Sequence, residues 1–287
     1  MRAPRRSQGP HPSPADVLDW LGAEPADRAD CEHLLAGETH PSVVGILEEL
    51  ERRLDADIDV EPSGGSVRDE LAWIEAYLRF APEVLRWHAA RGVPEEISRD
   101  TLADFGRNLA INRRVHGRFG MDTWPWLAHH FAGRLFQLGR LQYLIHRTDE
   151  PVPGLRAGEW ILGIHIPESG SLAQGALEES LAMARPFFAR CFPDRPVRLA
   201  NCASWLLDPY LRGHMEPASN IVRFARLFTS YGLPTDAPTD AVYFTFRTRR
   251  MDGLKELPRK TSLQRTVLER IDDGGTWQLG HGYLPLP

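Results

Sequence analysis

Hydrophobic residues recur with a helical period over the first half of the chain, from residue 13 to about residue 138. They fall at i, i+3 and i+7 in two stripes: Leu71, Ile74, Leu78 and Leu102, Phe105, Leu109. Ser66 is expected to cap the first of these helices, since a serine oxygen can accept hydrogen bonds from first-turn amides. The last helix is expected over residues 124–138, with Gly139 as its cap. The pattern predicts an all-α domain over residues 13–135.

After Gly139 the period shortens to two residues, which is the period of a strand. Strands are expected over residues 140–147, 160–166, 197–202, 221–228 and 241–247. A helix is expected between the second and third strands, ended or kinked near Pro186. Asp208 with Pro209 favours the start of a short helix, and Thr261 favours the start of another. This order predicts a mixed α/β sheet over residues 136–287, so the whole chain is expected to be an α+β protein.

The composition limits the classes of protein to which the chain can belong. Its 287 residues are 42% hydrophobic and 25% charged, the balance of a packed globular protein. A net charge of −5 argues against general nucleic-acid binding, and no stretch approaches the ~20 apolar residues of a membrane helix. The three cysteines form no disulfide or zinc pattern. We therefore expect a cytoplasmic protein without a metal site.

Charge is unevenly distributed along the chain. Residues 1–135 hold 16 basic and 23 acidic residues, a net −7, whereas residues 136–287 hold 18 basic and 16 acidic residues, a net +2. Much of the positive charge lies in residues 247–265. Two interpretations of that segment remain, a solvated face and a site for a small polyanion. The negative charge of the helical half would attract a cationic amine.

The most informative stretch for function is the strand expected over residues 160–166 and the turn after it. Leu162, Ile164 and Ile166 face one side of the strand, and Gly163 and His165 face the other. A glycine inside a strand often marks a place where a ligand comes close. The turn supplies Ser169, Gly170 and Ser171 at the start of a helix, where unpaired amides favour a phosphate group.

The second half of the chain resembles the C-terminal domain of a family of bacterial acyltransferases whose fold is similar to the GNAT N-acetyltransferases. The helical half is similar to the domain that precedes it in that family. The matching segments are Leu138-Gly-Arg-Leu-Gln-Tyr143, Gly163-Ile-His-Ile-Pro-Glu-Ser-Gly170, Ser204-Trp-Leu-Leu-Asp-Pro209, Ser219-Asn-Ile-Val-Arg-Phe224 and Pro258-Arg-Lys-Thr-Ser-Leu-Gln264. One feature departs from the wider superfamily. The phosphate-loop pattern Gln/Arg-x-x-Gly-x-Gly/Ala is absent in that form.

The resemblance implies a sheet whose two central parallel strands splay apart, with coenzyme A (CoA) entering the gap. Acyl-CoA would be a co-substrate, with no permanently bound cofactor, and an amine would accept the acyl group by direct transfer. The residues that would line the CoA site are Ile164, Ile166, Ser169, Gly170, Ser171, Asn201 and Cys202. Backbone groups near Ile164 would bind the pantetheine amides, and the turn would receive the pyrophosphate.

Transfer of an acyl group to nitrogen needs a base for the amine and a proton for the departing thiolate. His165 or Glu168, at the end of a strand, is a candidate base. Cys202, Ser204 and Tyr210, where the next strand ends, are candidates near the thiol. Each has a structural alternative, because Glu168 also suits a helix start, Ser204 suits a cap and Tyr210 suits packing.

Two other functions remain open at the level of sequence. In the first, Cys202 or Ser204 is a nucleophile with His165 as its base, for hydrolysis or covalent acyl transfer. In the second, the fold is a non-catalytic CoA-binding or interaction module. Cys202 also suits the role of a small buried hydrophobic residue.

Overall fold

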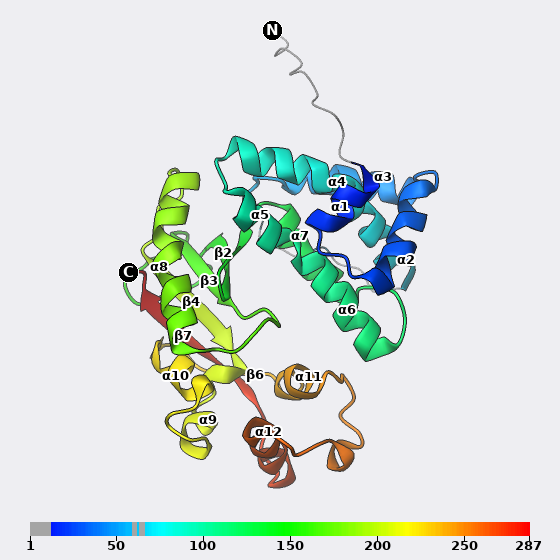
Figure 1. The fold of residues 1–287 in the computed structure, drawn as a ribbon. Coiled ribbons are helices and arrows are strands. Elements are labelled where there is room, and N and C mark those ends of the chain that lie inside the picture. Colours follow the sequence, from blue (N-terminus) through cyan, green and yellow to red (C-terminus); the bar gives the residue numbers. More distant parts are fainter. Residues whose placement is uncertain (1–12, 59–61, 63–66) are drawn as a thin grey trace. The chain divides into compact units, whose positions relative to one another are not determined.

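The computed structural model describes residues 13–58, 62 and 67–287. The chain divides into two compact units, Met1–Phe136 and Gln137–Pro287 (Figure 1). The expected cap at Ser66 lies outside the described residues. No helix in the described part of the chain is both long and apolar enough to cross a bilayer.

The N-terminal unit is built from helices. They are α1 (Pro14–Trp20), α2 (Pro25–Ala36), α3 (Pro41–Arg53), α4 (Val67–Ala90), α5 (Glu95–Leu102), α6 (Asp104–His116) and α7 (Trp124–Phe131). Several begin with proline in the first turn, where its missing N–H would have had no helical partner. At α1, Ser13 and Asp16 form a capping box, in which each side chain accepts a hydrogen bond from the other's backbone N–H.

An apolar core holds these helices together. Ile74, Leu78, Leu102, Phe105 and Leu109 of the two predicted stripes are all buried in it, with Leu71 packed at its edge. Trp73 of α4 stacks on Trp124 of α7, with ring centroids 4.5 Å apart. The helical N-terminal half predicted from the sequence is therefore confirmed.

The predicted C-terminal end of the last helix in this half, residue 138, is wrong. Helix α7 ends at Phe131, and Gly133 then adopts a positive φ of 67°. A side chain at that position would have to enter a left-handed backbone conformation, which favours glycine. The strand β1 (Leu135–Leu138) follows, so the apolar residues at the end of the helical pattern belong to a sheet.

His88 gives the N-terminal unit a specific dependence on pH. The side chain is 1% exposed, with Nδ1 3.0 Å from the hydroxyl of Ser98 and the ring 5.3 Å from that of Phe136. Burial lowers the pKa of His88 from 6.5 to about 4, because the imidazolium would lose its hydration. Below pH 6.5 the unfolded chain therefore binds this proton more readily than the folded chain.

We expect the free energy of unfolding to be highest above pH 6.5 and to fall as the pH drops towards 4, with about 3 kcal/mol lost through His88. Urea titrations at several pH values measure this. The variant His88→Gln cannot take up the proton, so its profile should be flatter over the same range. Equal slopes for the two proteins would contradict the assignment.

The C-terminal unit is a mixed sheet with helices. Its strands are β2 (Leu141–Arg147), β3 (Trp160–His165), β4 (Leu199–Ser204), β5 (Thr229–Ser230), β6 (Thr235–Asp236) and β7 (Gln278–Pro285). Its helices are α8 (Gln174–Cys191), η1 (Trp205–Leu207), α9 (Pro209–His214), α10 (Asn220–Arg226), α11 (Asp240–Phe246), η2 (Leu254–Glu256) and α12 (Ser262–Asp272). The strand order is β1-β2-β3-β4-β7-β5, with β6 also paired to β7.

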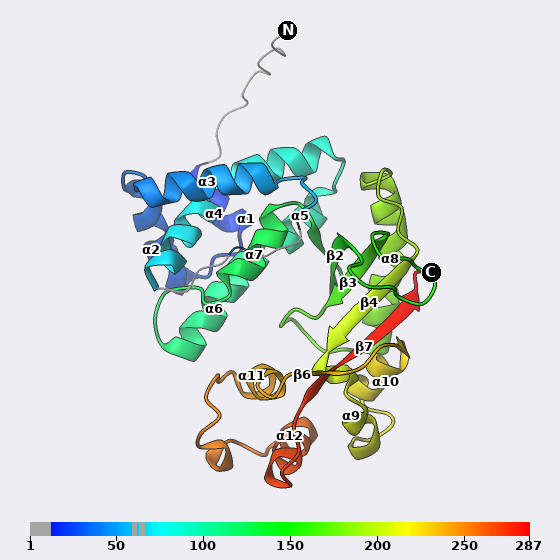
Figure 2. The ribbon, with the colours of Figure 1, turned by 180° about the vertical axis from the view of Figure 1, so that it is seen from behind.

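One parallel pair lies at the centre of this sheet. Strands β3 and β4 run parallel, joined by α8, while β2 pairs antiparallel with β3 and β7 pairs antiparallel with β4. Helix α8 lies along one face of the sheet in both views (Figures 1 and 2), where the Tyr143 and Ser180 hydroxyl oxygens are 3.1 Å apart. The predicted α+β fold, a helical half followed by a mixed sheet, is confirmed.

Two predicted strands are helices instead. Residues 221–228 fall mostly in α10 and residues 241–247 mostly in α11. At α10 the Ser219 hydroxyl accepts a hydrogen bond from the N–H of Val222, which closes the first turn of a helix. Short apolar runs do not distinguish helix from strand by period alone. Helix α8 likewise does not end at Pro186 but continues to Cys191.

The sequence pattern missed β7, the longest strand of the sheet, although it forms one side of the centre. Glycine and histidine within it give no strand signal. The structure shows why glycine stands there: a Cβ on Gly280 would lie 2.5 Å from the Leu207 carbonyl oxygen, and a Cβ on Gly282 would lie 2.6 Å from Phe228 Cβ. Close packing by η1 and the residues before β5 therefore requires glycine.

Candidate active site

The two central parallel strands, β3 and β4, are paired over only part of their length. Their ladder joins Leu162 to Ala200 and Gly163 to Asn201. No later β3–β4 pair occurs among the described residues, although β3 continues to His165 and β4 continues to Ser204 in its ladder with β7. The splayed centre predicted for the sheet is therefore confirmed, and the gap opens beyond Gly163 and Asn201.

Two imidazole rings border the space above Gly163. Gly163 and His165 lie on one face of β3, opposite the face that carries Leu162 and Ile164. A Cβ placed on Gly163 would lie 3.3 Å from Nε2 of His165 and 3.4 Å from Nε2 of His146. Glycine at this position therefore lets two half-buried histidines lie close over the strand, next to the point at which the strands separate.

Asn201 reaches the same face from β4. It pairs with Gly163 in the ladder, so its side chain lies on the face of the two histidines. Its Oδ1 is buried and has no hydrogen-bond partner among the described residues. A buried carbonyl oxygen without a donor is costly, and the N–H of a ligand amide would satisfy it. The pantetheine arm of CoA carries such amides.

The turn between β3 and α8 is held by Arg140. Its guanidinium donates hydrogen bonds to the carbonyl oxygens of Pro167 and Gly170, both at 3.2 Å, and of Ser171, at 3.0 Å. Gly170 has a positive φ of 66° in this turn. Helix α8 then begins at Gln174 with no side chain capping its first amides. Those N–H groups and the positive end of the helix suit a phosphate group.

Glu168 lies in the same turn and forms an ion pair with Arg247 at the end of α11. The pair joins the turn to a helix that is distant in sequence. Arg247 itself has a positive φ of 55°, a strained conformation for a residue with a side chain. The structure thus gives Glu168 a structural contact, and its part in catalysis stays a prediction.

Ser204 and Tyr210 lie on the segments after β4 and have partners there. The Ser204 hydroxyl accepts a hydrogen bond from the N–H of Leu206, 3.1 Å away, and begins η1. Tyr210 stacks on His214 with ring centroids 3.6 Å apart, and the Arg270 guanidinium lies 4.5 Å from its ring. Capping and packing, the structural alternatives for these two residues, describe their contacts, and their catalytic roles stay predictions.

Cys202 is enclosed on the side of the sheet opposite Asn201. It is 3% exposed, and burial raises the pKa of its thiol to about 12. Burial has the same effect on Cys31, whose pKa is also raised to about 12, chiefly by desolvation. A thiol in this state is almost wholly protonated at neutral pH and is a poor nucleophile.

We expect Cys202 to stay unmodified during turnover. Intact-mass measurement after mixing the protein with acyl-CoA should show no added acyl group, and iodoacetamide should alkylate Cys202 as slowly as Cys31 in the folded protein. The variant Cys202→Ala should keep its activity within about threefold. A thioester mapped to Cys202 would contradict this and favour covalent transfer.

The basic segment 247–265 is largely paired with acids. Arg250 contacts Asp252 and Arg259 contacts Asp272, each at 2.6 Å. A hollow of about 870 Å³ lies beside Arg259 and Lys255. The ion pairs favour a solvated, charge-balanced face, and a polyanion site there stays a prediction.

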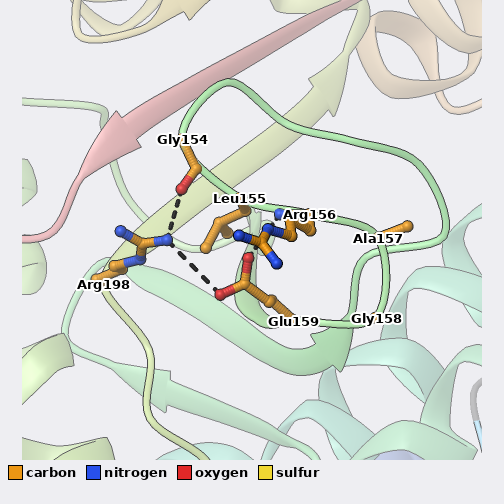
Figure 3. A pocket seen from close by; sticks show the side chains of 7 residues that line it. All are labelled: Gly154, Leu155, Arg156, Ala157, Gly158, Glu159 and Arg198. Carbon is orange, nitrogen blue, oxygen red and sulfur yellow. Dashed lines mark hydrogen bonds and ion pairs between the residues drawn. The ribbon is translucent and has the colours of Figure 1, made fainter.

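A second hollow, of about 780 Å³, lies at the other end of the β3–β4 pair (Figure 3). Arg198, just before β4, donates a hydrogen bond to the Gly154 carbonyl oxygen at 2.6 Å and pairs with Glu159 at 3.6 Å. These contacts fasten the connection between β2 and β3 to the start of β4. The hollow is therefore distinct from the splayed end of the strands. Among the described residues there is also no cluster of metal-ligating side chains.

Comparison with known families decides the kind of protein. Residues 13–133 match the N-acyltransferase N-terminal domain, and residues 135–284 match the GNAT-like C-terminal domain. The chain belongs to this two-domain acyltransferase family. The resemblance inferred from the sequence motifs is thereby confirmed.

Solved structures of acyltransferases are similar to this acyltransferase over nearly its whole length. One, in complex with CoA and 10C-teicoplanin, is 31% identical with a TM-score of 0.83, over 95% of this chain and 87% of that chain. A mutant in complex with octanoyl-CoA is 32% identical with a TM-score of 0.84, and one with decanoyl-CoA and teicoplanin is 32% identical with a TM-score of 0.82, each with the same coverage. The comparison with curated proteins found no significant match.

The predicted activity, acyl-CoA-dependent transfer to nitrogen, is confirmed at the level of the family. The acyltransferase brings together His165, Gly163 and Asn201 at the splay. Ser169, Gly170 and Ser171, expected at a helix start, lie in the turn before α8, which begins at Gln174. The sequence analysis did not identify His146 as a neighbour of Gly163. The signal for it was the alternation of β2, but only the pairing with β3 shows which of its residues face Gly163.

Proposed function

We propose that this acyltransferase moves an acyl group from CoA directly to an amine that lies above Gly163. The observation that carries the proposal is the separation of β3 from β4 beyond Gly163 and Asn201, with two imidazoles beside the gap. The thioester would lie in the gap, the amine would approach over the glycine, and His165 would accept a proton from it. In this proposal residues 13–135 form the helical domain and residues 136–287 form the acyltransferase domain.

CoA would follow the open edges of the two strands. Backbone groups of Ile164 and Ile166 would bind the pantetheine amides from one side, and the unpaired Oδ1 of Asn201 would accept an amide N–H from the other. The pyrophosphate would lie against the turn that Arg140 holds, at the uncapped start of α8. The N–H groups of Gly170 and Ser171 would replace the glycine-rich loop of the wider superfamily, whereas the N–H of Ser169 is donated to the Pro167 carbonyl oxygen, 2.8 Å away.

The acyl group and acceptor are proposed from the solved relatives. Those acyltransferases are seen with octanoyl-CoA, with decanoyl-CoA and with teicoplanin. We therefore favour a medium-length acyl chain and a large polar acceptor that carries an amine. The three cysteines of the chain are all free and buried, which supports the cytoplasm as its compartment.

The test is an assay of thiol release over a panel of acyl-CoAs and amines, with the variant Gly163→Val. A side chain there would meet both histidines and occupy the amine's space, at a cost of about 1–3 kcal/mol, or roughly ten- to hundredfold in kcat/KM. CoA should still raise the melting temperature of the variant, because its proposed contacts with the backbone of Ile164 and Ile166 and with the turn before α8 are unchanged.

Gly45→Val is the matched control, since a Cβ on Gly45 of α3 meets nothing within 4 Å. It should keep wild-type activity. The proposal fails if no amine supports thiol release, or if Gly163→Val is as active as Gly45→Val.

A further inference from the structure

We propose that Asn201 is a catalytic residue, whose Nδ2 donates a hydrogen bond to the thioester carbonyl oxygen of acyl-CoA and stabilises the negative charge that forms there. This inference rests on the proposed function, because it takes the thioester to lie in the gap between β3 and β4. It adds a second use of one side chain. Oδ1 would hold a pantetheine amide, and Nδ2 would act on the reacting carbonyl.

Asn201 lies at the point where the gap begins. It forms the last β3–β4 pair among the described residues, with Gly163, and the rest of β4 pairs only with β7. In that second ladder its partner is Tyr283. Asn201 shares its face of the sheet with Gly163 and with His165, two residues further along β3. The amide of Asn201 and the proposed base are therefore on the same face at the narrow end of the gap.

The side chain of Asn201 is not used within the protein. A carboxamide has an oxygen that accepts hydrogen bonds and an NH2 group that donates two. The Oδ1 atom is buried without a partner, and Nδ2 makes no hydrogen bond with any described residue. By contrast, the amide of Gln278 on β7 donates from Nε2 to Asp236, 3.2 Å away. A buried polar atom without a partner lowers stability, so the unpaired amide of Asn201 indicates a ligand that pairs with it.

Acyl-CoA carries two complementary groups close to each other. Only two methylene carbons and the sulfur separate its last amide nitrogen from the thioester carbon. If Oδ1 accepts the N–H of that amide, the thioester lies beside the same side chain. Because Nδ2 is bonded to the same carbon as Oδ1, one asparagine can contact the amide and the thioester carbonyl together.

The reaction places negative charge on the carbonyl oxygen. The lone pair of a neutral amine attacks the thioester carbon, the C–N bond forms, and the carbonyl π electrons move to the oxygen. A hydrogen bond from Nδ2 strengthens as this charge develops, so it stabilises the tetrahedral intermediate more than the substrate. The C=O bond then re-forms, the C–S bond breaks with its electron pair on sulfur, and one proton passes from nitrogen to that sulfur. The sum is amine plus thioester going to amide plus thiol.

The test is the variant Asn201→Leu, which keeps the shape of the side chain and removes both polar atoms. With decanoyl-CoA and a primary alkylamine, we expect kcat to fall about a hundred- to thousandfold, the usual loss for one donor to an oxyanion. The melting temperature of the ligand-free variant should equal or exceed that of the wild type, because a buried unpaired oxygen is removed and no internal hydrogen bond is lost.

The variant Asn201→Asp separates the two proposed contacts. Its carboxylate still accepts the amide N–H but has no N–H to donate. At pH 8, kcat should fall as far as in Asn201→Leu. The Kd of S-decyl-CoA, a thioether analogue that lacks the carbonyl oxygen, should stay within about threefold of the wild-type value.

Gln278→Ala is the matched control, because it removes an amide of the same sheet whose donor already has a partner, and its kcat should equal that of the wild type. If Asn201→Leu raises only KM for decanoyl-CoA, the side chain holds pantetheine without acting on the carbonyl, and the inference is overturned. A lower melting temperature with the loss of kcat also overturns it, since Asn201 would then be structural. If the wild-type enzyme releases thiol with no amine, the proposed function itself has failed, which is a separate result.

Discussion

Replacement of His165 by alanine is expected to lower kcat about a hundred- to ten-thousandfold, the usual contribution of a positioned acid–base group. The ring lies at the end of β3, and its Nε2 is 3.3 Å from the position of a Cβ on Gly163, beside the gap between β3 and β4. Loss of the ring removes the group that receives the proton of the attacking amine. Steady-state kinetics with a primary alkylamine as acceptor should show the loss.

The control for His165 is a second histidine of the same chain. His40→Ala changes an exposed residue at the start of α3, in the helical unit, and should leave kcat within about twofold of the wild type. KM for acyl-CoA should change little in His165→Ala, because the backbone around Ile164, which is proposed to bind pantetheine, stays in place. A His165→Ala enzyme with wild-type kcat would move the acid–base role to another group.

Replacement of Asp208 by alanine is expected to lower the free energy of unfolding by roughly 3–5 kcal/mol, the cost of leaving a buried ion without its partner. The carboxylate is 2% exposed and accepts hydrogen bonds from Arg270 Nη1 at 2.6 Å, from Gln278 N at 3.1 Å and from Tyr210 N at 2.9 Å. It thus ties α9, α12 and β7 to one another. Urea denaturation of the purified protein measures the change.

The chain offers a matched ion pair on its surface. Arg250 and Asp252 are also 2.6 Å apart, but their side chains are 78% and 70% exposed. Water solvates both charges there, so Asp252→Ala should leave stability unchanged within error. Comparison of the two variants separates the effect of burial on stability from the effect of the ion-pair distance. If the two substitutions have the same effect, the Asp208 pair does not hold the three elements together.

The stabilising role of Asp208 affects how measurements of activity at Tyr210 are interpreted. Tyr210 follows Asp208 and owes its position to the same network, since its ring lies between His214 and Arg270. An effect of Tyr210 substitution on activity would therefore need a stability measurement beside it. His165 lies apart from this network on β3, so a loss of activity there reports on chemistry more directly.

The sequence by itself determined the features that depend on neighbouring residues. The two stripes predicted which residues of α4 to α6 are buried, because the period of a helix is local. The second stripe, expected on one helix, is divided between α5, which ends at Leu102, and α6, which begins at Asp104. Asp208 with Pro209, and Thr261 with Gln264, marked two helix starts that the structure confirms, because a cap acts on the next three residues. The alternation of β3 placed Gly163 and His165 on one face, and the motifs identified the family.

Only the tertiary structure decided what depends on pairing between distant segments. The helices α10 and α11 were predicted as strands, because a short apolar run has the same composition in either state. Strand β7 is identified only by its backbone pairing with β4. Likewise, no local pattern brings His146 to Gly163. Their proximity is set by the register of β2 against β3, and register is fixed by packing across the whole sheet.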